Sequence, residues 1–173
     1  MTHDRQRFTT LYDRHRQQVW AYVVSRAGRQ VADEVVSETF AIAWRKFRDL
    51  PADALPYLLG IARNVLRENI REEARREGFR RELREWVAGD VGEQVAERLA
   101  LLKALEGLTQ DERDLLLLVA WEGLTPREAA KVVGCSAPTF RVRLHRARKR
   151  LQQELDRPAP TAVSRFDLSR EPS

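Results

Sequence analysis

Hydrophobic residues recur at steps of three and four along most of the chain, which is the periodicity of amphipathic helices. The clearest stripes fall within residues 8–23, 35–47 and 58–70. No stretch alternates apolar and polar residues in the manner of a strand. Breaks fall at 27–30 and 49–56, and two prolines in the second break bar a continuous helix. The pattern therefore predicts an all-α fold.

Changes in composition divide this chain into two small helical domains joined by a flexible linker. We predict a first domain over residues 4–77, a linker over 78–95, a second domain over 96–155 and a tail over 156–173. The linker prediction rests on three glycines and weak periodicity in residues 78–94, with some helix expected from Leu83 to Val87. The tail has three prolines and no periodicity, so we expect it to be disordered. Trp86, inside the linker, is expected to pack against one domain.

Residues 124–150 contain two helices separated by a tight turn. The sequences TQDE (109–112) and TPRE (125–128) match the capping box, which places helix starts near residues 110 and 126. Gly134 can end the first helix of the unit in the left-handed conformation, and Ser136 can cap the second. This is the arrangement of a helix-turn-helix, whose second helix enters the major groove of DNA.

The second helix of this unit concentrates positive charge. Between Ser136 and Arg150 it carries six cations and no acid, whereas the net charge of the whole chain is +5. A local anionic partner is therefore indicated. The outward face presents Arg141, Val142, His145 and Arg146 to base edges, and Arg143, Arg148, Lys149 and Arg150 suit phosphates. Neutralising about six phosphates would give a log–log salt slope of roughly −5.

Other chemistries find little support in the sequence. The single cysteine, Cys135, excludes an internal disulfide, and the three histidines lack zinc-ligand spacing with it. We expect no metal, no cofactor and no enzymatic activity, since neither paired carboxylates nor a nucleophile–base set is evident. The longest apolar run, 115–121, is too short for a bilayer span, and no signal peptide is evident. We expect a cytoplasmic protein.

The segment LTPREAAKVVGCSAPTFRVRLHRARKRL, residues 124–151, resembles the C-terminal DNA-binding domain of bacterial RNA polymerase sigma factors of the extracytoplasmic-function (ECF) class, in the sigma-70 family. The family's recognition-helix run is matched at Thr139, Arg141, Arg143, Arg146, Ala147 and Arg148. The sequence departs from it at Pro138, where glycine is usual, and at Val142, where serine is usual. The resemblance implies contacts with the minus-thirty-five promoter element by Thr139, Arg141, Val142, Arg143, His145, Arg146 and Lys149.

Two upstream segments extend the resemblance. ADEVVSETFAIAWRKF, residues 32–47, resembles the region that docks on the clamp helices of the polymerase β′ subunit. LPYLLGIARNVLRENIREEARR, residues 55–76, resembles the region that recognises and opens the minus-ten element. The implied core-polymerase contacts are Asp33, Glu34, Glu38 and Phe40. The implied minus-ten contacts are Tyr57, which replaces a usual tryptophan, with Asn64, Arg67, Arg71 and Arg75 on one polar helix face.

Taken together, these resemblances imply an alternative sigma factor. It would bind the RNA polymerase core at the β′ clamp helices and the β flap, recognise and melt promoter DNA, and catalyse no covalent chemistry. An anti-sigma factor is a family expectation. Two other interpretations stay open: a free-standing helix-turn-helix regulator whose first domain dimerises or senses a ligand, and a helical protein that binds anionic lipid through residues 141–150. Trp44 and Tyr57 could equally be core residues.

Overall fold

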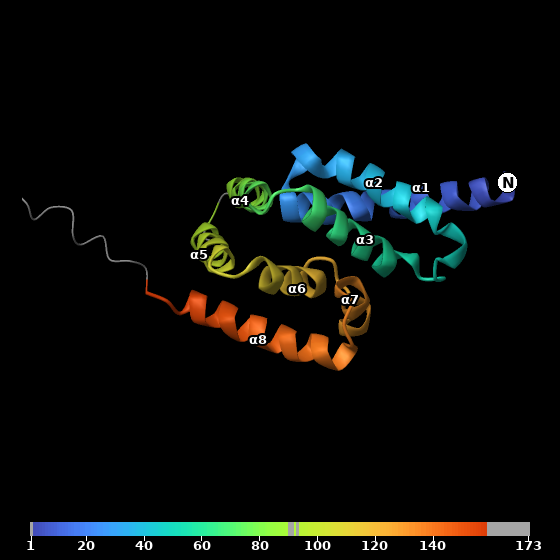
Figure 1. Cartoon of the computed structure of the whole chain (residues 1–173). Coiled ribbons are helices and arrows are strands. Elements are labelled where there is room, and N and C mark those ends of the chain that lie inside the picture. The colour runs from blue at the N-terminus through green and yellow to red at the C-terminus, as the bar shows by residue number, and fades with distance from the viewer. Residues whose placement is uncertain (1, 90–91, 93, 159–173) are drawn as a thin grey trace, which may run out of the picture.

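The computed structural model describes residues 2–89, 92 and 94–158, and every regular element among them is helical. The all-α prediction is therefore confirmed. The elements are α1 (Thr2–Ala27), η1 (Arg29–Val31), α2 (Ala32–Arg45), η2 (Phe47–Asp49), α3 (Ala54–Asn69), α4 (Glu72–Ala88), α5 (Val95–Glu106), α6 (Gln110–Ala120), α7 (Pro126–Val133) and α8 (Ala137–Leu155). Figure 1 shows α1 to α3 stacked over α6 to α8, with α4 and α5 at one end.

The helices α1 to α4 form an N-terminal body. Its core gathers the apolar stripes that the sequence predicts, including Val19, Val23, Val35 and Leu58, each at most 1% exposed. The predicted breaks are also present. Gly28 ends α1 with φ of 86°, a conformation that glycine adopts readily, and α3 begins only after Pro51.

Residues 72–88 form one continuous helix, α4, that packs along α1. The prediction of a linker over 78–95 is therefore wrong for residues 78–88, although the helix expected from Leu83 to Val87 is present. The glycine that suggested a linker has a packing role: Gly78 lies where α4 meets the end of α1, and its Cα approaches Gly28. Residues 89–94 alone join α4 to α5.

The helices α5 to α8 form a C-terminal body in which both predicted capping boxes are present. The Thr109 side chain accepts a hydrogen bond from the Glu112 amide at 3.2 Å, and the Glu112 carboxylate accepts one from the Thr109 amide at 2.9 Å. Thr125 and Glu128 make the same reciprocal pair at the start of α7. These bonds satisfy amides that a helix start leaves unpaired, and they fix where α6 and α7 begin.

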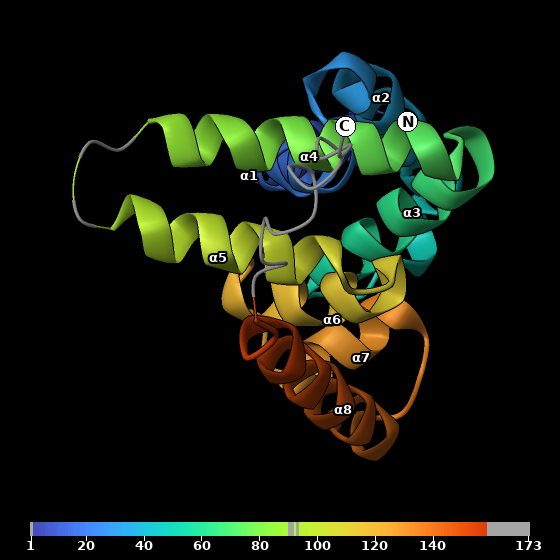
Figure 2. The ribbon, with the colours of Figure 1, turned by 90° about the vertical axis from the view of Figure 1, so that its left-hand side faces the viewer.

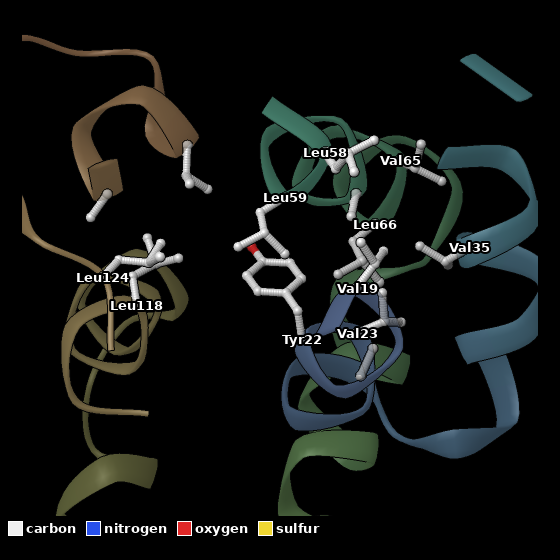
Figure 3. Packing of buried hydrophobic residues seen from close by; sticks show 14 of the residues in the cluster. Val19, Tyr22, Val23, Val35, Leu58, Leu59, Val65, Leu66, Leu118 and Leu124 are labelled. Atoms are coloured by element: carbon white, nitrogen blue, oxygen red, sulfur yellow. The ribbon is translucent and has the colours of Figure 1, made fainter. Parts of the chain in front are cut away.

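The two bodies share one hydrophobic core. The helix α3 packs on α7, and Figure 2 shows α4 and α5 running beside each other across one end of the molecule. In Figure 3, Tyr22 and Leu59 lie on one side of the contact and Leu118 and Leu124 on the other. Trp86 also crosses it, with its ring edge-on to Trp121 at a centroid distance of 6.3 Å. It therefore contacts both bodies rather than one.

α8 ends at Leu155, and the tail that we expected to be disordered lies, from residue 159 onward, outside the described residues. Within the described part of the chain, no helix combines the length and apolar character that a membrane crossing demands.

Candidate nucleic-acid and polymerase interfaces

The turn and the recognition helix α8 are built as the sequence predicts. Gly134 adopts the left-handed conformation with φ of 77°, and the Ser136 hydroxyl accepts a hydrogen bond from the Thr139 amide at 3.3 Å. Pro138 falls in the first turn of α8, where its missing N–H costs nothing. Phe140 and Ala147 are at most 1% exposed, so one face of α8 is fixed against α6 and α7. The opposite face is left to solvent.

That solvent-exposed face carries most of the predicted minus-thirty-five residues. Thr139, Arg141, Val142, His145, Arg146 and Lys149 are exposed, whereas Arg143 is half-buried. The Val142 side chain is 52% exposed and offers an apolar contact on this face. None of the ion pairs between described residues engages Arg141, Arg143 or Arg146. The face therefore presents several uncompensated cations around one apolar side chain.

The predicted polymerase-docking residues divide between surface and core. Asp33, Glu34 and Glu38 on α2 are exposed, and Glu38 pairs with Arg45 at 3.6 Å. Phe40 is only 4% exposed, because its ring packs edge-on against Tyr12 at 4.8 Å. The structure thus corrects the placement of Phe40: this ring holds α2 against α1 and does not reach the surface.

An aromatic cluster lies at the C-terminal end of α2. Trp44 is 46% exposed, and its ring contacts Phe8 at 4.9 Å and Phe47 at 6.0 Å. Trp44 is therefore neither a core residue nor a free surface residue. It lies in the last turn of α2, where it packs against α1 and η2.

The predicted minus-ten residues do not share one helix. α3 ends at Asn69 because Ile70 is extended, with φ of −110° and ψ of 124°. Asn64 and Arg67 lie on α3, whereas Arg71 is the residue directly before α4 and Arg75 lies within α4. The prediction of one continuous polar helix face is therefore wrong. Asn64, Arg67 and Arg71 are exposed, and Tyr57 and Arg75 are half-buried.

A buried polar cluster between the two bodies was not predicted from the sequence. We call it the Asp114 network; its members are Tyr22, Arg26, Arg63, Arg67, Asp111, Asp114 and Glu122. Asp114, on α6, accepts hydrogen bonds from Arg63 Nε at 2.8 Å, Arg26 Nε at 3.1 Å and the Tyr22 hydroxyl at 3.4 Å. One carboxylate of the C-terminal body thus binds three donors from α1 and α3.

Two further carboxylates complete the network. Glu122 accepts from Arg26 Nη1 at 2.6 Å. Asp111 accepts from Arg67 Nη2 at 2.6 Å and lies 3.5 Å from Arg63 Nη2. The side chains of Arg26, Arg63 and Asp114 are 9%, 10% and 12% exposed, so these charges are shielded from water. The one sequence signal for the network is Arg63, a cation that falls among the apolar positions of α3.

A small cavity adjoins the network, with a volume of about 50 Å³. Five arginines line it, namely Arg26, Arg63, Arg67, Arg75 and Arg113, against the two carboxylates Asp111 and Asp114. Two buried guanidinium nitrogens, Arg26 Nη2 and Arg75 Nε, find no acceptor among the described residues. Burial lowers the pKa of Arg75, and the charge of Arg67 lowers it further. Positive charge exceeds negative charge at this interface.

The environment of Tyr22 keeps its phenol protonated. Burial raises the pKa of Tyr22, and the negative charge of Asp114 raises it further. The hydroxyl is therefore a hydrogen-bond donor to Asp114 at any physiological pH. Burial alone would lower the pKa of Arg26, but Tyr22, Asp114 and Glu122 outweigh it, and the pKa is raised.

The chain combines the exposed basic helix of a helix-turn-helix with a helical body that has an acidic face. This combination is that of a DNA-binding transcription factor with a second surface suited to a protein partner. Comparison with known proteins agrees. The family model for sigma-70 region 2 matches residues 11–76, and that for sigma-70 region 4 matches residues 98–151. The ECF RNA polymerase sigma factor SigC of Mycobacterium tuberculosis is 34% identical over 140 residues, covering 78% of this chain and 76% of SigC. The chain belongs to the ECF sigma factor family.

Other matches cover less of their relatives. RfaY of Xanthomonas campestris, named a probable RNA polymerase sigma factor, is 33% identical over 147 residues, and the chain spans 79% of its own length but only 35% of RfaY. The Streptomyces coelicolor RNA polymerase sigma-E factor is 39% identical over 66 residues, which is 38% of this chain and 37% of that protein.

Two known structures share the fold over most of the chain. CnrH, solved in complex with the cytosolic domain of CnrY, has a TM-score of 0.61 at 27% identity, covering 88% of this chain and 89% of CnrH. The sigma factor RpoE of Bartonella quintana, solved with the anti-sigma factor NepR, has a TM-score of 0.61 at 24% identity, covering 88% of this chain and 99% of RpoE. The second similarity concerns the fold alone.

Proposed function

We propose that this chain is an alternative sigma factor that binds the RNA polymerase core and directs promoter recognition and melting. It performs no covalent chemistry itself and acts in the cytoplasm, where the polymerase works. One observation carries the proposal: a single chain of the sigma family exposes both an uncompensated basic face on α8 and an acidic face on α2. The first suits DNA, and the second suits a basic protein surface.

For the minus-thirty-five element, α8 enters the major groove with its exposed face. Arg141 and Arg146 carry planar guanidinium groups that can bond guanine O6 and N7 in bidentate fashion, and Val142 can pack on a thymine methyl. His145 donates to a base acceptor, and Lys149 and Arg143 lie on the same helix for adjacent phosphates. The capped start of α8 holds these side chains in a fixed register.

For the minus-ten element, the residues around the junction of α3 and α4 contact the opened strand. Asn64 offers both a donor and an acceptor to a base edge. Arg67, Arg71 and Arg75 neutralise phosphates, and Tyr57, near the loop that precedes α3, can stack on an unpaired base. Stacking on an aromatic ring offsets the cost of taking a base out of the duplex.

For polymerase binding, Asp33, Glu34 and Glu38 dock on a basic surface of the β′ clamp helices, and the C-terminal body contacts the β flap. Complementary charge of this kind steers association and fixes the register of a complex. The exposed part of Trp44, in the last turn of the same helix, adds an apolar contact, as aromatic residues do in many interfaces.

We further propose that an anti-sigma factor binds this chain when transcription is not required. Two structures that share the fold support the proposal: the sigma factor RpoE of Bartonella quintana was solved with the anti-sigma factor NepR, and CnrH was solved with the cytosolic domain of CnrY.

Run-off transcription with purified core polymerase tests the function, followed by sequencing of the promoters selected. Arg141→Ala and Arg146→Ala are each expected to weaken promoter use by about 1–3 kcal/mol, the value of one bidentate base contact. Arg84→Ala, at an exposed arginine on α4, is the matched control and should transcribe as the wild type does. Full activity of both α8 variants would contradict the groove assignment.

Core binding is tested separately by pull-down. The double variant Asp33→Lys and Glu38→Lys should lose the polymerase, while Asp13→Lys with Glu77→Lys, at two exposed acids elsewhere, should retain it. Retention by the first pair would remove the docking assignment. A wild-type chain that binds specific duplex DNA tightly and ignores core polymerase would instead be a free-standing regulator. Co-sedimentation with anionic vesicles would identify a lipid-binding protein.

A further inference from the structure

We infer that Asp111 and Asp114 of the C-terminal body take the place of DNA phosphates. In the closed arrangement these two carboxylates pair with arginines of the N-terminal body, and the same arginines bind the promoter backbone once the two bodies separate. The inference rests on the proposed function and deepens it. It adds Arg63 to the DNA-binding residues and makes the Asp114 network a latch that covers the minus-ten surface.

The bodies must separate because the observed packing cannot bridge a promoter. The minus-ten and minus-thirty-five elements are centred about 25 base pairs apart, which is roughly 85 Å of duplex at 3.4 Å per pair. In the structure α3, which carries Asn64 and Arg67, packs directly on α7, the helix before the recognition helix. α8 itself is only about 28 Å long at 1.5 Å per residue. The closed arrangement therefore cannot contact both promoter elements at once.

One arginine that pairs with the latch carboxylates lies on the predicted DNA surface, and a second lies beside it on α3. Arg67, predicted from the sequence to contact the minus-ten region, holds Asp111 at 2.6 Å. Arg63 lies one turn earlier on the same helix and holds Asp114 at 2.8 Å. A carboxylate offers an arginine the same two-oxygen geometry as a phosphate. In the closed arrangement Arg63 is shielded from solvent, with 10% of its side chain exposed, and Arg67, whose side chain is 44% exposed, is paired with Asp111.

The charge at the interface suits a more anionic partner than two carboxylates. Four arginines of the N-terminal body, Arg26, Arg63, Arg67 and Arg75, line the cavity together with Asp111 and Asp114. Arg26 also pairs with Glu122, whereas Arg75 Nε has no acceptor among the described side chains and backbone. Buried ion pairs contribute little net stability because desolvation offsets their attraction. A latch made of them can therefore be exchanged for a chain of phosphates.

A glycine permits the closed packing. Gly60 lies on α3 where α7 approaches, and a Cβ there would lie 3.3 Å from the Val132 carbonyl oxygen. Glycine weakens a helix interior, and the close approach of α7 is the packing use that the structure shows for this residue. A long side chain at position 60 would push α7 away without altering the core of either body.

The experiment measures opening and DNA binding on the full chain. Förster transfer between dyes at Arg14→Cys and Gln153→Cys, in a Cys135→Ser background, reports the separation of the two bodies. Anisotropy of a mixed-sequence DNA containing an unpaired bubble reports backbone binding, which needs no promoter sequence. The latch variants are Asp114→Asn and Gly60→Gln. The control is Asp13→Asn, which makes the same charge change at an exposed site.

Both latch variants are expected to lower energy transfer and to tighten DNA binding by about tenfold or more, since affinity scales with the fraction of open chain. The control should change neither. Adding Arg63→Ala to Gly60→Gln should reduce the log–log salt slope of binding by about one. Gly60→Gln keeps the test decisive if Asp114→Asn fails to fold, because it leaves the buried charges intact.

Three results would overturn the inference: a wild-type chain that is already open, unchanged energy transfer in both latch variants, or opening without tighter DNA binding. None of these depends on polymerase. Failure of the proposed function is recognised separately, as the absence of any transcript from wild-type chain with core polymerase.

Discussion

Replacing Gly78 by alanine tests whether α4 belongs to the N-terminal body. In the structure a Cβ at position 78 would lie 1.9 Å from the Ala27 carbonyl oxygen and 2.3 Å from its carbonyl carbon. Both are backbone atoms, so no side chain can rotate away to make room. Reaching an ordinary carbon–oxygen contact of about 3.3 Å requires a displacement of more than 1 Å between the two helices.

The cost of this displacement is bounded by the cost of undocking α4. Phe79 and Val87 are 4% and 8% exposed, and exposing both would cost about 3–6 kcal/mol at 1.5–3 kcal/mol each. Alanine favours the helix over glycine by about 1 kcal/mol. The expected net loss of unfolding free energy is therefore about 2–5 kcal/mol.

Urea denaturation followed by circular dichroism measures this loss. Gly89→Ala is the matched control, because a Cβ there meets nothing closer than 3.5 Å and the backbone is already helical, with φ of −72°. A Gly78→Ala chain as stable as the wild type would show that residues 78–88 behave as the linker that the sequence suggested.

The remaining predictions concern the C-terminal body. Phe140→Ala, at a fully buried ring, should cost about 3–5 kcal/mol, seen as a lower melting temperature, and a change below 1 kcal/mol would contradict the packing of α8. Ser136→Ala removes the cap of α8 and should cost about 1 kcal/mol in the same assay, with Ser37→Ala on an exposed face of α2 as control. Arg148→Ala should reduce the salt slope of DNA binding by about one without changing sequence preference, and an altered preference would place Arg148 on a base.

The sequence was most informative where structure depends on neighbouring residues. The starts of α6, α7 and α8 could be predicted to within a residue because Thr109, Thr125 and Ser136 cap amides only three positions away. The inward stripe of α8 followed from the helical period for the same reason. The exposure of Arg141 and Arg146 then followed directly.

The sequence was least informative where distant segments meet. Arg63 and Asp114 are 51 residues apart, and no local pattern indicates that they pair. Gly78 resembles a break in a one-dimensional pattern, whereas its use is the close approach of α4 to Gly28. The end of α3 at Asn69 was missed because Ile70 becomes extended without a proline or glycine to signal it. Phe40 falls in the apolar stripe of residues 35–47, and only the family resemblance assigned it to polymerase docking; the structure buries its ring against Tyr12.

The six residues between α4 and α5 determine how strongly the latch has to bind. A connection of this length extends at most about 25 Å, which limits how far the start of α5 can move from the end of α4 when the C-terminal body undocks. Short tethers produce effective concentrations in the millimolar range. A separate C-terminal body supplied at micromolar concentration would compete poorly with the tethered one. The tether thus lets a contact of modest intrinsic affinity remain closed, and it lets that contact reform each time the DNA is released.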